Sequence, residues 1–408
     1  MTSSISTTVA GTSKPRPRFN AQLPATPSSK VKPRPYQPGL IPSPSILRPH
    51  CLSRDRLRLW RPSSSRSGEP ITLADTDLDR ILEVINVSWA QGTRETYGAG
   101  LLVYHVFCDS RNIPDDVRCP ASPLLIVTFI SSCAGSYSGS ALANYVFGVR
   151  AWHILHGLPW VMDDAQVKAA LTGATNLAPP TSKRPKREPF TVSLIETICT
   201  KLDPKDHLDA SVRACLVNAF YTLARIGEFT VPSIDSFDPT THIKRSDVCK
   251  AQDRHGHLVT VFRIPRTKCS NAGEDVYCAA QPGLVDPLAE LNNHFQINNP
   301  PPNAHLFSYP HLNGFRPLTK RIFMNRLNAI TSSLNLDSLK GHGVRIGGTL
   351  EYLLRGIPFD VVKSMGRWGS DAFVLYLRKH AVIMAPYLQC GPVLEAFTRY
   401  TMPPVRRH

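Results

Sequence analysis

Four residues near the C-terminal end of the chain are of types that can act together on a phosphodiester. His342 and Arg345 are three residues apart, so on a helix their side chains point the same way. A guanidinium matches two phosphate oxygens, and an imidazole can move a proton near neutral pH. Trp368 offers an indole N–H, and the phenol of Tyr376 can act as a covalent nucleophile. The stretch 341–378 is therefore a candidate phosphodiester site, although a chance pair and an ordinary tyrosine would look the same.

A further arginine follows an apolar segment that is predicted to be a helix over Asp209–Leu223. Arg225 stands in the sequence Ala-Arg-Ile-Gly-Glu, with Glu228 three residues later. Arg225 can cap the helix by bonding its last carbonyls, while Gly227 supplies the turn. Alternatively, Arg225 is a buried arginine that is directed at a phosphate and oriented by Glu228. The residues themselves leave both interpretations open.

Strand patterns follow this segment, over Thr241–Val248, Leu258–Ile264 and Asp275–Ala280. The loop Pro265–Gly273 between the last two is typical of a hairpin and carries Lys268 near its tip. A lysine at such a tip is usually just solvated. It becomes part of a site if the tip folds over a bound phosphate.

Helical periodicity and capping residues predict the remaining elements. In the second half of the chain, helices are predicted over Thr191–Leu202, Val285–Phe295, Thr319–Leu334, His342–Arg355, Pro358–Met365, Ser370–Arg378 and the apolar tail Pro386–Arg399. The tail is expected to need a partner surface on its own domain or on another protomer. In the first half, a compact helical domain is predicted from Asp77–Trp89, a helix capped by Thr93, Ser122–Gly135, Ser138–His156 and Asp163–Thr172.

The charge of the chain favours an anionic partner such as nucleic acid. The formal net charge is +16 over 408 residues. Residues 1–70 hold twelve of the 36 prolines and twelve Lys or Arg against two acidic residues. A disordered basic arm is therefore predicted over 1–72, because little apolar surface is available to offset the entropy of ordering. In the helical domain, Arg94, Arg150, His153 and His156 can face a phosphate backbone or simply water.

Four parts are predicted along the chain: the arm 1–72, a helical domain 73–175, a linker 176–189 and a second domain 190–408. A proline pair and a basic cluster mark the linker. The cluster consists of Lys183, Arg184, Lys186 and Arg187. It can contact DNA, act as a nuclear import signal, or be a solvated hinge.

Several classes of protein are disfavoured by composition. The ten cysteines include no C-x-x-C pair and no Cys/His cluster at metal spacing, so neither a metal site nor a disulfide framework is predicted. The thiols are expected to be reduced in the nucleus or cytosol. No apolar run reaches the length of about 18 residues that a membrane span needs, and the N-terminus lacks the apolar core of a secretory signal. No cofactor and no small-molecule substrate is predicted.

In chain order the candidate residues are Arg225, Lys268, His342, Arg345, Trp368 and Tyr376. This order, with the Ala-Arg-Ile-Gly-Glu box, the lysine hairpin and the His-Gly-Val-Arg box, resembles the tyrosine recombinase (phage integrase-like) family over roughly residues 75–400. Residues 365–373, Met-Gly-Arg-Trp-Gly-Ser-Asp-Ala-Phe, are especially similar to the eukaryotic Crypton- and DIRS-like branch of mobile elements. The resemblance implies a mainly α (α+β) fold, with a helical SAM-like core-binding domain and a mostly helical catalytic domain that contains a small antiparallel three-stranded sheet.

The resemblance also implies a role for each residue. Arg225 and Arg345 are expected to clamp the scissile phosphate while Tyr376 attacks the phosphorus. His342 is expected to move a proton, and Lys268 to protonate the departing 5′ oxygen. The product is a 3′-phosphotyrosyl link, made without metal or nucleotide. The expected partner is double-stranded DNA in the nucleus, held in a two-domain clamp, with four protomers on two sites.

The sequence departs from the family pattern in three places. Trp368, expected to pack on the site and offer its N–H, lies eight residues before Tyr376, one fewer than in many bacterial and phage members. Gly227 replaces a commoner serine. Gly347 and Gly348 weaken a helix directly after the His-x-x-Arg pair, and are interpreted as a sign of relaxed selection in a decayed or domesticated copy.

Alternatives to this reading come from three classes. The chain can be a non-catalytic DNA-binding protein derived from such an element, a type IB topoisomerase with the same nucleophile chemistry, or an interaction protein whose basic arm binds RNA or acidic partners. Tyr352 and Tyr387 are weaker candidates for the nucleophile, since the first is too close to the His-x-x-Arg turn and the second lies outside the motif.

Overall fold

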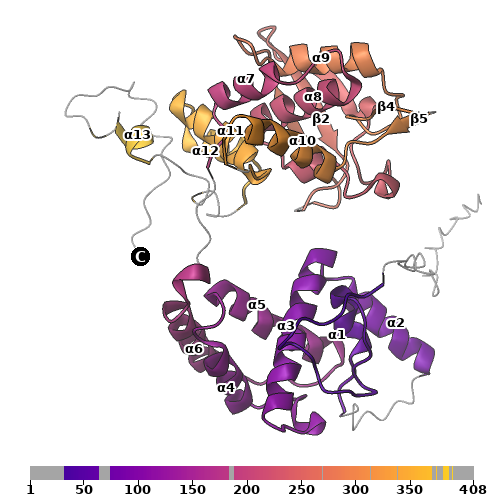
Figure 1. Cartoon of the computed structure of the whole chain (residues 1–408), viewed down its shortest axis with the longest axis vertical. Helices are drawn as coiled ribbons and strands as arrows, with labels where there is room; N and C mark the ends of the chain where they lie inside the picture. The colour runs from indigo at the N-terminus through magenta and orange to yellow at the C-terminus, as the bar shows by residue number, and fades with distance from the viewer. Residues whose placement is uncertain are drawn as a thin grey trace, which may run out of the picture. The chain divides into compact units, whose positions relative to one another are not determined.

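The computed structural model in Figure 1 describes residues 32–63, 74–182, 188–268, 270–312, 314–337, 339–369, 374, 380–385 and 388. The chain divides into two compact units, Met1–Arg184 and Pro185–His408. Each unit has its own cluster of buried apolar side chains. The division falls inside the predicted linker, and the basic cluster of that linker lies outside the described residues.

The first unit is helical. Its α-helices are α1 (Arg56–Leu59), α2 (Asp75–Asn86), α3 (Gln91–Ser110), α4 (Pro123–Cys133), α5 (Gly139–Leu155) and α6 (Asp164–Asn176). Two glycines allow α3 and α5 to pack with their backbones close together. A Cβ on Gly100 would lie 2.5 Å from the Cα of Tyr145, and one on Gly148 would lie 2.5 Å from the backbone oxygen of Tyr97.

Two helix starts in this unit confirm the capping argument. Ser122 and Ser138 each accept a hydrogen bond from the backbone N–H three residues later, at 3.2 and 3.3 Å. The predicted cap at Thr93 is wrong, because α3 already begins at Gln91 and has no side-chain cap.

Part of the predicted disordered arm is folded. Within residues 32–63, Leu57 and Trp60 are fully buried in the core of the first unit. The indole N–H of Trp152 in α5 donates to the backbone oxygen of Trp60 at 2.6 Å, which attaches this segment to the helices. The prediction of disorder over all of 1–72 is therefore wrong for residues 32–63. The prediction used the average composition of a proline-rich stretch. That average does not reveal a few apolar side chains that pack against residues far along the chain.

The second unit is built around α8 (His207–Tyr221), most of whose side chains are buried. The other α-helices are α7 (Val192–Thr200), α9 (Pro287–Asn298), α10 (Lys320–Ser333), α11 (His342–Leu354), α12 (Phe359–Met365) and α13 (His380–Met384). An antiparallel sheet has the order β1 (Val248–Gln252), β2 (Leu258–Ile264) and β3 (Glu274–Cys278). The predicted fold class, mainly α with a small antiparallel three-stranded sheet, is confirmed.

Some predicted elements differ from the structure. The first predicted strand is wrong, since residues 245–247 form a 3-10 helix and β1 begins only at Val248. A two-stranded hairpin, β4 (Tyr309–His311) with β5 (Gly314–Arg316), was not predicted because Pro310 interrupts the strand pattern. The helices predicted over 370–378 and 386–399 fall outside the described residues, apart from Val374 and Leu388.

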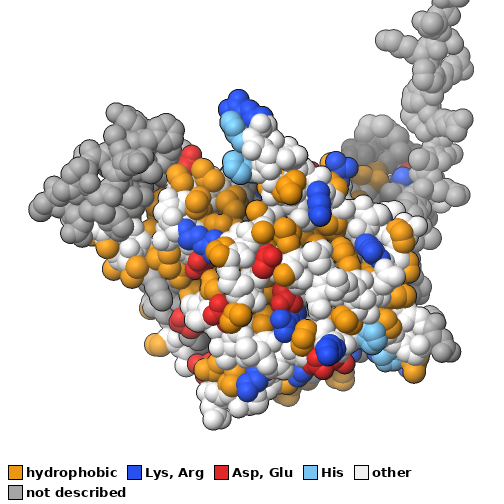
Figure 2. Space-filling model, turned by 90° about the horizontal axis from the view of Figure 1, so that it is seen from above, with side chains coloured by type: hydrophobic (Ala, Val, Ile, Leu, Met, Phe, Trp, Pro, Cys, Tyr) orange, Lys and Arg blue, Asp and Glu red, His pale blue; other side chains and the backbone are white. Residues whose placement is uncertain are grey.

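The surface carries charge of both signs. On the face seen from above in Figure 2, Lys and Arg side chains are interspersed with Asp, Glu and apolar side chains rather than gathered in one basic patch. Within the described part of the chain, every helix is too short or too polar to cross a bilayer.

Candidate active site

Arg225 lies at the start of a short 3-10 helix, η4 (Ile226–Glu228). Its Nη1 donates to Glu228 Oε1 at 2.8 Å, and its backbone N–H donates to Glu228 Oε2 at 2.8 Å. The arginine side chain is 27% exposed, whereas that of Glu228 is 7% exposed. Because α8 ends at Tyr221 with Thr222 as its C-cap, Arg225 is not the cap of that helix. Glu228 holds Arg225 with its guanidinium partly open to solvent.

Glu228 has a second partner, Arg367, which the sequence did not suggest. Arg367 Nη2 donates to Glu228 Oε2 at 2.6 Å, and its Nη1 donates to Glu274 Oε2 at 3.2 Å. The Thr267 hydroxyl donates to the same Glu274 oxygen at 2.5 Å. Burial would raise the pKa of the Glu228 carboxyl, but Arg367 and Arg225 outweigh burial and hold the pKa below its ordinary value. Glu228 is therefore ionised at neutral pH and bridges two arginines.

The end of α12 directs Arg367 toward these acids. The N–H of Trp368 donates to the oxygen of Lys363 at 3.1 Å, and the N–H of Arg367 to that of Ser364 at 2.9 Å. These two bonds define a Schellman motif, whose left-handed position is usually glycine. Arg367 occupies it with φ 57°. A Cβ on Gly366 would lie 1.6 Å from an indole carbon of Trp368, so glycine is needed where the ring folds back.

Arg345 is almost entirely buried, at 1% exposure. Its Nη2 donates to the backbone oxygen of Gly366, and its guanidinium lies 4.3 Å from the centroid of the Trp368 ring. Both contacts orient the guanidinium, and the ring adds a cation–π attraction. Trp368 in turn packs with Leu223, Leu350, Leu353, Val362 and Ile383.

The turn between α8 and Arg225 has an unusual backbone. Leu223 is fully buried and has φ 52°, a conformation that a bulky residue rarely adopts. It places the leucine side chain in the cluster that supports Trp368, two residues before Arg225. Strained residues of this kind occur at functional sites where surrounding contacts hold them.

Two glycines fix the position of α11, which packs on α8. A Cβ on Gly347 would lie 1.9 Å from the backbone oxygen of Phe190, and one on Gly348 would lie 2.2 Å from that of Phe220. Backbone atoms at such distances leave no room for a side chain. The glycine pair therefore has a packing role, which replaces its interpretation as a sign of relaxed selection.

His342 is the first residue of α11 and is half-buried. The residue before it, Gly341, lies beside η4, since a Cβ there would be 3.4 Å from Ile226 Cγ1. The start of α11 and the segment that carries Arg225 are thus neighbours.

Lys268 is exposed in the β2–β3 loop, and its ammonium has no hydrogen bond or ion pair with another described residue. The loop itself is ordered by its own contacts. The Thr267 N–H donates to the oxygen of Ser270 at 2.9 Å, and the Ser270 hydroxyl donates to the oxygen of Gly273 at 3.0 Å. At the base of the hairpin, Glu274 is the acid that binds Arg367, so the loop is attached to the other elements one residue beyond Gly273.

Tyr376 lies outside the described residues, as do Lys183, Arg184, Lys186 and Arg187. The described residues on either side of Tyr376 include Trp368 and Ile383, which belong to one buried cluster.

In the first unit, Arg94 is half-buried on the first turn of α3. His153 cannot face a phosphate, because it is fully buried. Its Nε2 accepts from the N–H of Ala121 at 2.8 Å, and its Nδ1 donates to the oxygen of Val149 at 2.8 Å. Burial lowers the pKa of His153 to about 4. The interpretation of His153 as a phosphate contact is therefore wrong.

The arrangement can bind and polarise an anion. Arg225 is held by Glu228, and Arg345 is held by Gly366 and Trp368, so contacts within the protein orient both guanidinium groups. Arg367 was not predicted as a site residue. The sequence feature that marks it is an arginine at the position after a helix where a glycine in the left-handed conformation is usual. Among the described residues, no group of three or more His, Cys, Asp or Glu is placed to hold a metal ion.

No protein-family model matches the sequence, and no match was found among the curated proteins. Solved structures with a similar fold include a XerH site-specific recombinase bound to a palindromic difH substrate, with 13% identity, a TM-score of 0.48, and coverage of 78% of this chain and 85% of that one. They also include a lambda integrase dimer bound to a COC′ core site, with 13% identity, a TM-score of 0.43, and coverage of 75% and 95%. XerA recombinase matches with 14% identity, a TM-score of 0.33, and coverage of 77% and 97%. A function for this chain rests on its own residues.

Proposed function

We propose that the protein is a tyrosine recombinase that breaks and rejoins DNA through a 3′-phosphotyrosyl intermediate. The observation that carries the proposal concerns three consecutive residues. The oxygen of Gly366 accepts from Arg345, Arg367 binds Glu228 and Glu274, and Trp368 packs under Arg345. Three segments that are far apart in the sequence are thereby tied to one short turn: η4 next to Arg225, α11 with His342 and Arg345, and the base of the hairpin that carries Lys268.

In the proposed reaction, Arg225 and Arg345 bind the non-bridging oxygens of the scissile phosphate and stabilise the charge of the transition state. Such a preorganised donor is worth about 3 kcal/mol in other enzymes. The Tyr376 oxygen attacks phosphorus and passes its proton to His342. The bond from phosphorus to the 5′ oxygen breaks, and Lys268 gives that oxygen a proton. A 5′ hydroxyl from the incoming strand reverses the step, so no net bond energy is lost.

Trp368 completes the proposed site by packing against Arg345 and offering its indole N–H to a phosphate oxygen. Glu228 and Arg367 act as positioning residues, since Glu228 is an acid that would repel a phosphate and Arg367 is held between Glu228 and Glu274. Lys268 is exposed, so its role requires the β2–β3 loop to close over bound DNA.

The proposal extends to origin and assembly. The Met-Gly-Arg-Trp-Gly sequence supports a eukaryotic, mobile-element branch of the family and nuclear localisation. Double-stranded DNA is the proposed partner, contacted also by Arg94 and by the cluster Lys183, Arg184, Lys186 and Arg187. Four protomers on two paired sites are proposed for the synapse.

Covalent trapping tests the proposal. The full chain is incubated with nicked duplexes taken from the flanks of its own gene, in the presence of a chelator, and run on a denaturing gel. The expected result is a protein–DNA adduct that Tyr376→Phe abolishes. Arg345→Lys keeps the charge but loses the planar fork, and is expected to slow adduct formation by about a hundredfold.

Other outcomes select the alternatives. DNA that is retarded on a native gel but never linked covalently favours a non-catalytic DNA-binding protein. Relaxation of supercoiled plasmid that needs Tyr376 but no paired sites favours a type IB topoisomerase. Unchanged nucleic-acid binding after removal of residues 190–408 favours an interaction protein that acts through its basic arm.

A further inference from the structure

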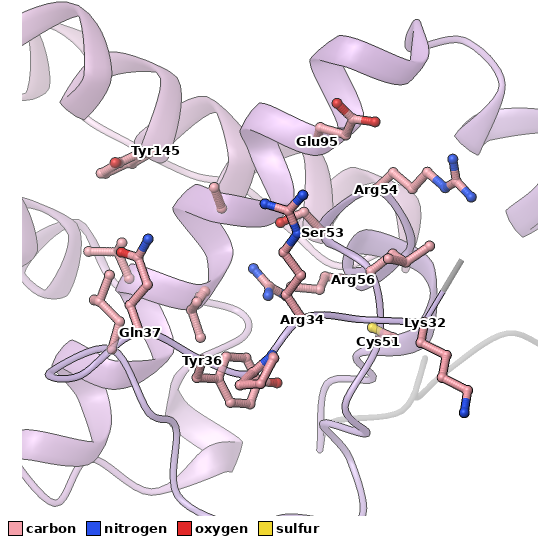
Figure 3. Close-up of a pocket in the computed structure, with 16 residues that line it drawn as sticks. Lys32, Arg34, Tyr36, Gln37, Cys51, Ser53, Arg54, Arg56, Glu95 and Tyr145 are labelled. Carbon is pink, nitrogen blue, oxygen red and sulfur yellow. The ribbon is translucent and has the colours of Figure 1, made fainter. Parts of the chain in front are cut away.

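The first unit contains a basic pocket that the proposed chemistry does not use. It lies between residues 32–56 and helices α3 and α5, with a volume of about 700 Å³ (Figure 3). Four cationic side chains line it, against one acidic side chain, that of Glu95. The cations are Lys32, Arg34, Arg54 and Arg56. In Figure 3 the guanidinium groups of Arg34 and Arg56 lie among the lining residues, and Lys32 and Arg54 lie toward the edge.

Arg56 is the decisive residue because it is buried and forms no ion pair with an acid in the part of the chain that the structure describes. It is 7% exposed, and its Nη1 donates to the backbone oxygen of Gly98 at 3.1 Å. Its guanidinium lies 5.6 Å from the ring centroid of Tyr36 and 5.4 Å from that of Trp60. Within the described residues, Arg56 Nε and the Tyr36 hydroxyl are buried without a hydrogen-bond partner. Burial lowers the pKa of Arg56, as expected where no carboxylate compensates.

Other buried arginines of the same unit are paired. Arg118 Nη1 lies 2.7 Å from Asp109 Oδ1, and Arg48 forms an ion pair with Asp115. The unit thus supplies acids to guanidinium groups that serve only its structure. A buried cation that lacks such an acid is costly unless an anion from elsewhere binds it.

The pocket is formed by close packing rather than by a loose loop. A Cβ on Gly98 would lie 1.8 Å from the backbone oxygen of Ser53. The absence of a Cβ at Gly98 lets the segment around Ser53 lie directly against α3, where Arg56 bonds the oxygen of Gly98. The hydrogen bond to Gly98 and the rings of Tyr36 and Trp60 therefore orient the Arg56 guanidinium before any ligand binds, which lowers the entropic cost of binding.

The remaining lining residues indicate what the anion is attached to. Tyr36 and Tyr145 provide aromatic surface, and Leu40, Leu102 and Val103 provide apolar surface. Arginine forks match phosphate oxygens, while aromatic and apolar walls suit a base and sugar. We propose that this pocket binds a nucleotide through its phosphate, either as a free nucleotide or as a unit of a DNA strand. The proposal does not rest on the strand-cleavage chemistry, because all of these residues lie in the first unit.

Calorimetric titration of the full chain tests the proposal with two probes, deoxyadenosine 5′-monophosphate and a 5′-phosphorylated single-stranded tetranucleotide. The double variant Lys32→Gln/Arg34→Gln changes exposed side chains and is expected to fold. It should weaken binding of the preferred probe by about tenfold or more, as expected for lost charge-assisted hydrogen bonds. Arg56→Met should abolish that binding. Arg58→Gln is the control, and it is matched in charge to Arg56→Met, since it removes one positive charge from an exposed position of α1 outside the pocket.

Each outcome decides the question. The double variant Lys32→Gln/Arg34→Gln is called the rim variant. If the mononucleotide binds, and the rim variant weakens this binding while Arg58→Gln does not, the ligand is a free nucleotide. The same pattern with the tetranucleotide alone supports a unit of a DNA strand. The proposal is overturned if neither probe binds, or if the rim variant and Arg58→Gln have equal effects.

Discussion

Arg367 adopts a left-handed backbone conformation, φ 57°, that an arginine takes only at some cost. The contacts of its side chain offset that cost, because it pairs with two carboxylates on different elements, Glu228 on η4 and Glu274 on β3. Both the arginine and Glu228 are largely buried. At the scale of single residues, the site is held by a charged network in which each member depends on the others.

A double-mutant cycle between Arg367 and Glu228 is expected to show strong coupling. Arg367→Gly relieves the backbone strain but leaves the buried carboxylate of Glu228 and the partly exposed one of Glu274 without this partner, and Glu228→Gln removes the shared acid. Each single change is expected to lower the free energy of unfolding of the second unit by about 3 kcal/mol, with a coupling energy of about 1–3 kcal/mol. Urea unfolding followed by far-UV circular dichroism measures both.

The control for this cycle is Arg321→Gln, which alters an exposed arginine on α10. It is expected to change stability by less than about 0.5 kcal/mol. Single-variant costs that simply add in the double variant would contradict a direct Arg367–Glu228 interaction.

His153 makes the stability of the first unit depend on pH. Its folded pKa of about 4 lies below the ordinary value of 6.5, so the unfolded state takes up the proton first. The contribution of the neutral ring is complete above pH 6.5 and is lost as the pH falls toward 4, by up to about 1.4 kcal/mol per pH unit. Urea midpoints measured between pH 7.5 and 4.5 should therefore fall less steeply for His153→Gln than for the unaltered protein. Equal slopes would show that the proton does not go to this residue.

Elements are positioned in both units by glycines that face backbone. In the second unit, Gly347 and Gly348 let α11 approach α8 and the segment before α7, and this approach brings Arg345 to the end of α12. The cost of two glycines to the helix, about 1 kcal/mol each, is offset by the contact. At the scale of elements, the residues of a helix are set more by the elements that it packs against than by helix propensity.

Gly347→Ala and Gly173→Ala are expected to have opposite effects. The first places a Cβ 1.9 Å from the Phe190 oxygen, and should destabilise the second unit by more than about 3 kcal/mol. The second adds a Cβ in α6 with nothing within 4 Å, and should stabilise the first unit by up to about 1 kcal/mol. Thermal unfolding of each variant tests this. A harmless Gly347→Ala would mean that α11 does not pack on the backbone at Phe190.

At the scale of the whole molecule, the chain consists of two units with separate cores. Much of the net charge of +16 lies in residues 1–70, part of which forms the wall of the basic pocket. Residues 32–63 are thus part of the first unit's fold as well as a source of charge.

Fragments of the first unit test this view. A fragment of residues 32–182 contains Leu57, Trp60 and the helices that bury them, and is expected to unfold in one cooperative transition. A fragment of residues 74–182 lacks both side chains and exposes the apolar surface that they cover, so it is expected to lose that transition or aggregate. Circular dichroism on heating compares the two. A cooperative transition of equal midpoint in the shorter fragment would show that residues 32–63 contribute nothing to the core.

The sequence by itself determined what depends on neighbours along the chain. Spacings of a few residues predicted the helical periodicity, the caps at Ser122 and Ser138, and the Arg225–Glu228 pair. The candidate catalytic residues were likewise recognised from short motifs and their order along the chain. These spacings place side chains on one helix face or within one turn, so they can be recognised without a structure. They were sufficient to predict most helices and the β2–β3 hairpin, whereas the fold class was predicted from the resemblance of the motifs to a known family.

Only the tertiary structure decided what depends on residues that are far apart. Arg367 meets Glu228 across 139 positions, and Trp152 meets Trp60 across 92. No local pattern signals such contacts, because the partner's identity is set by how the elements pack. The same reason explains why the glycine pair of α11 was misinterpreted and why residues 32–63 were expected to be disordered. It also explains why the surroundings of Arg56, which among the described residues include no acid paired with it, could not be predicted.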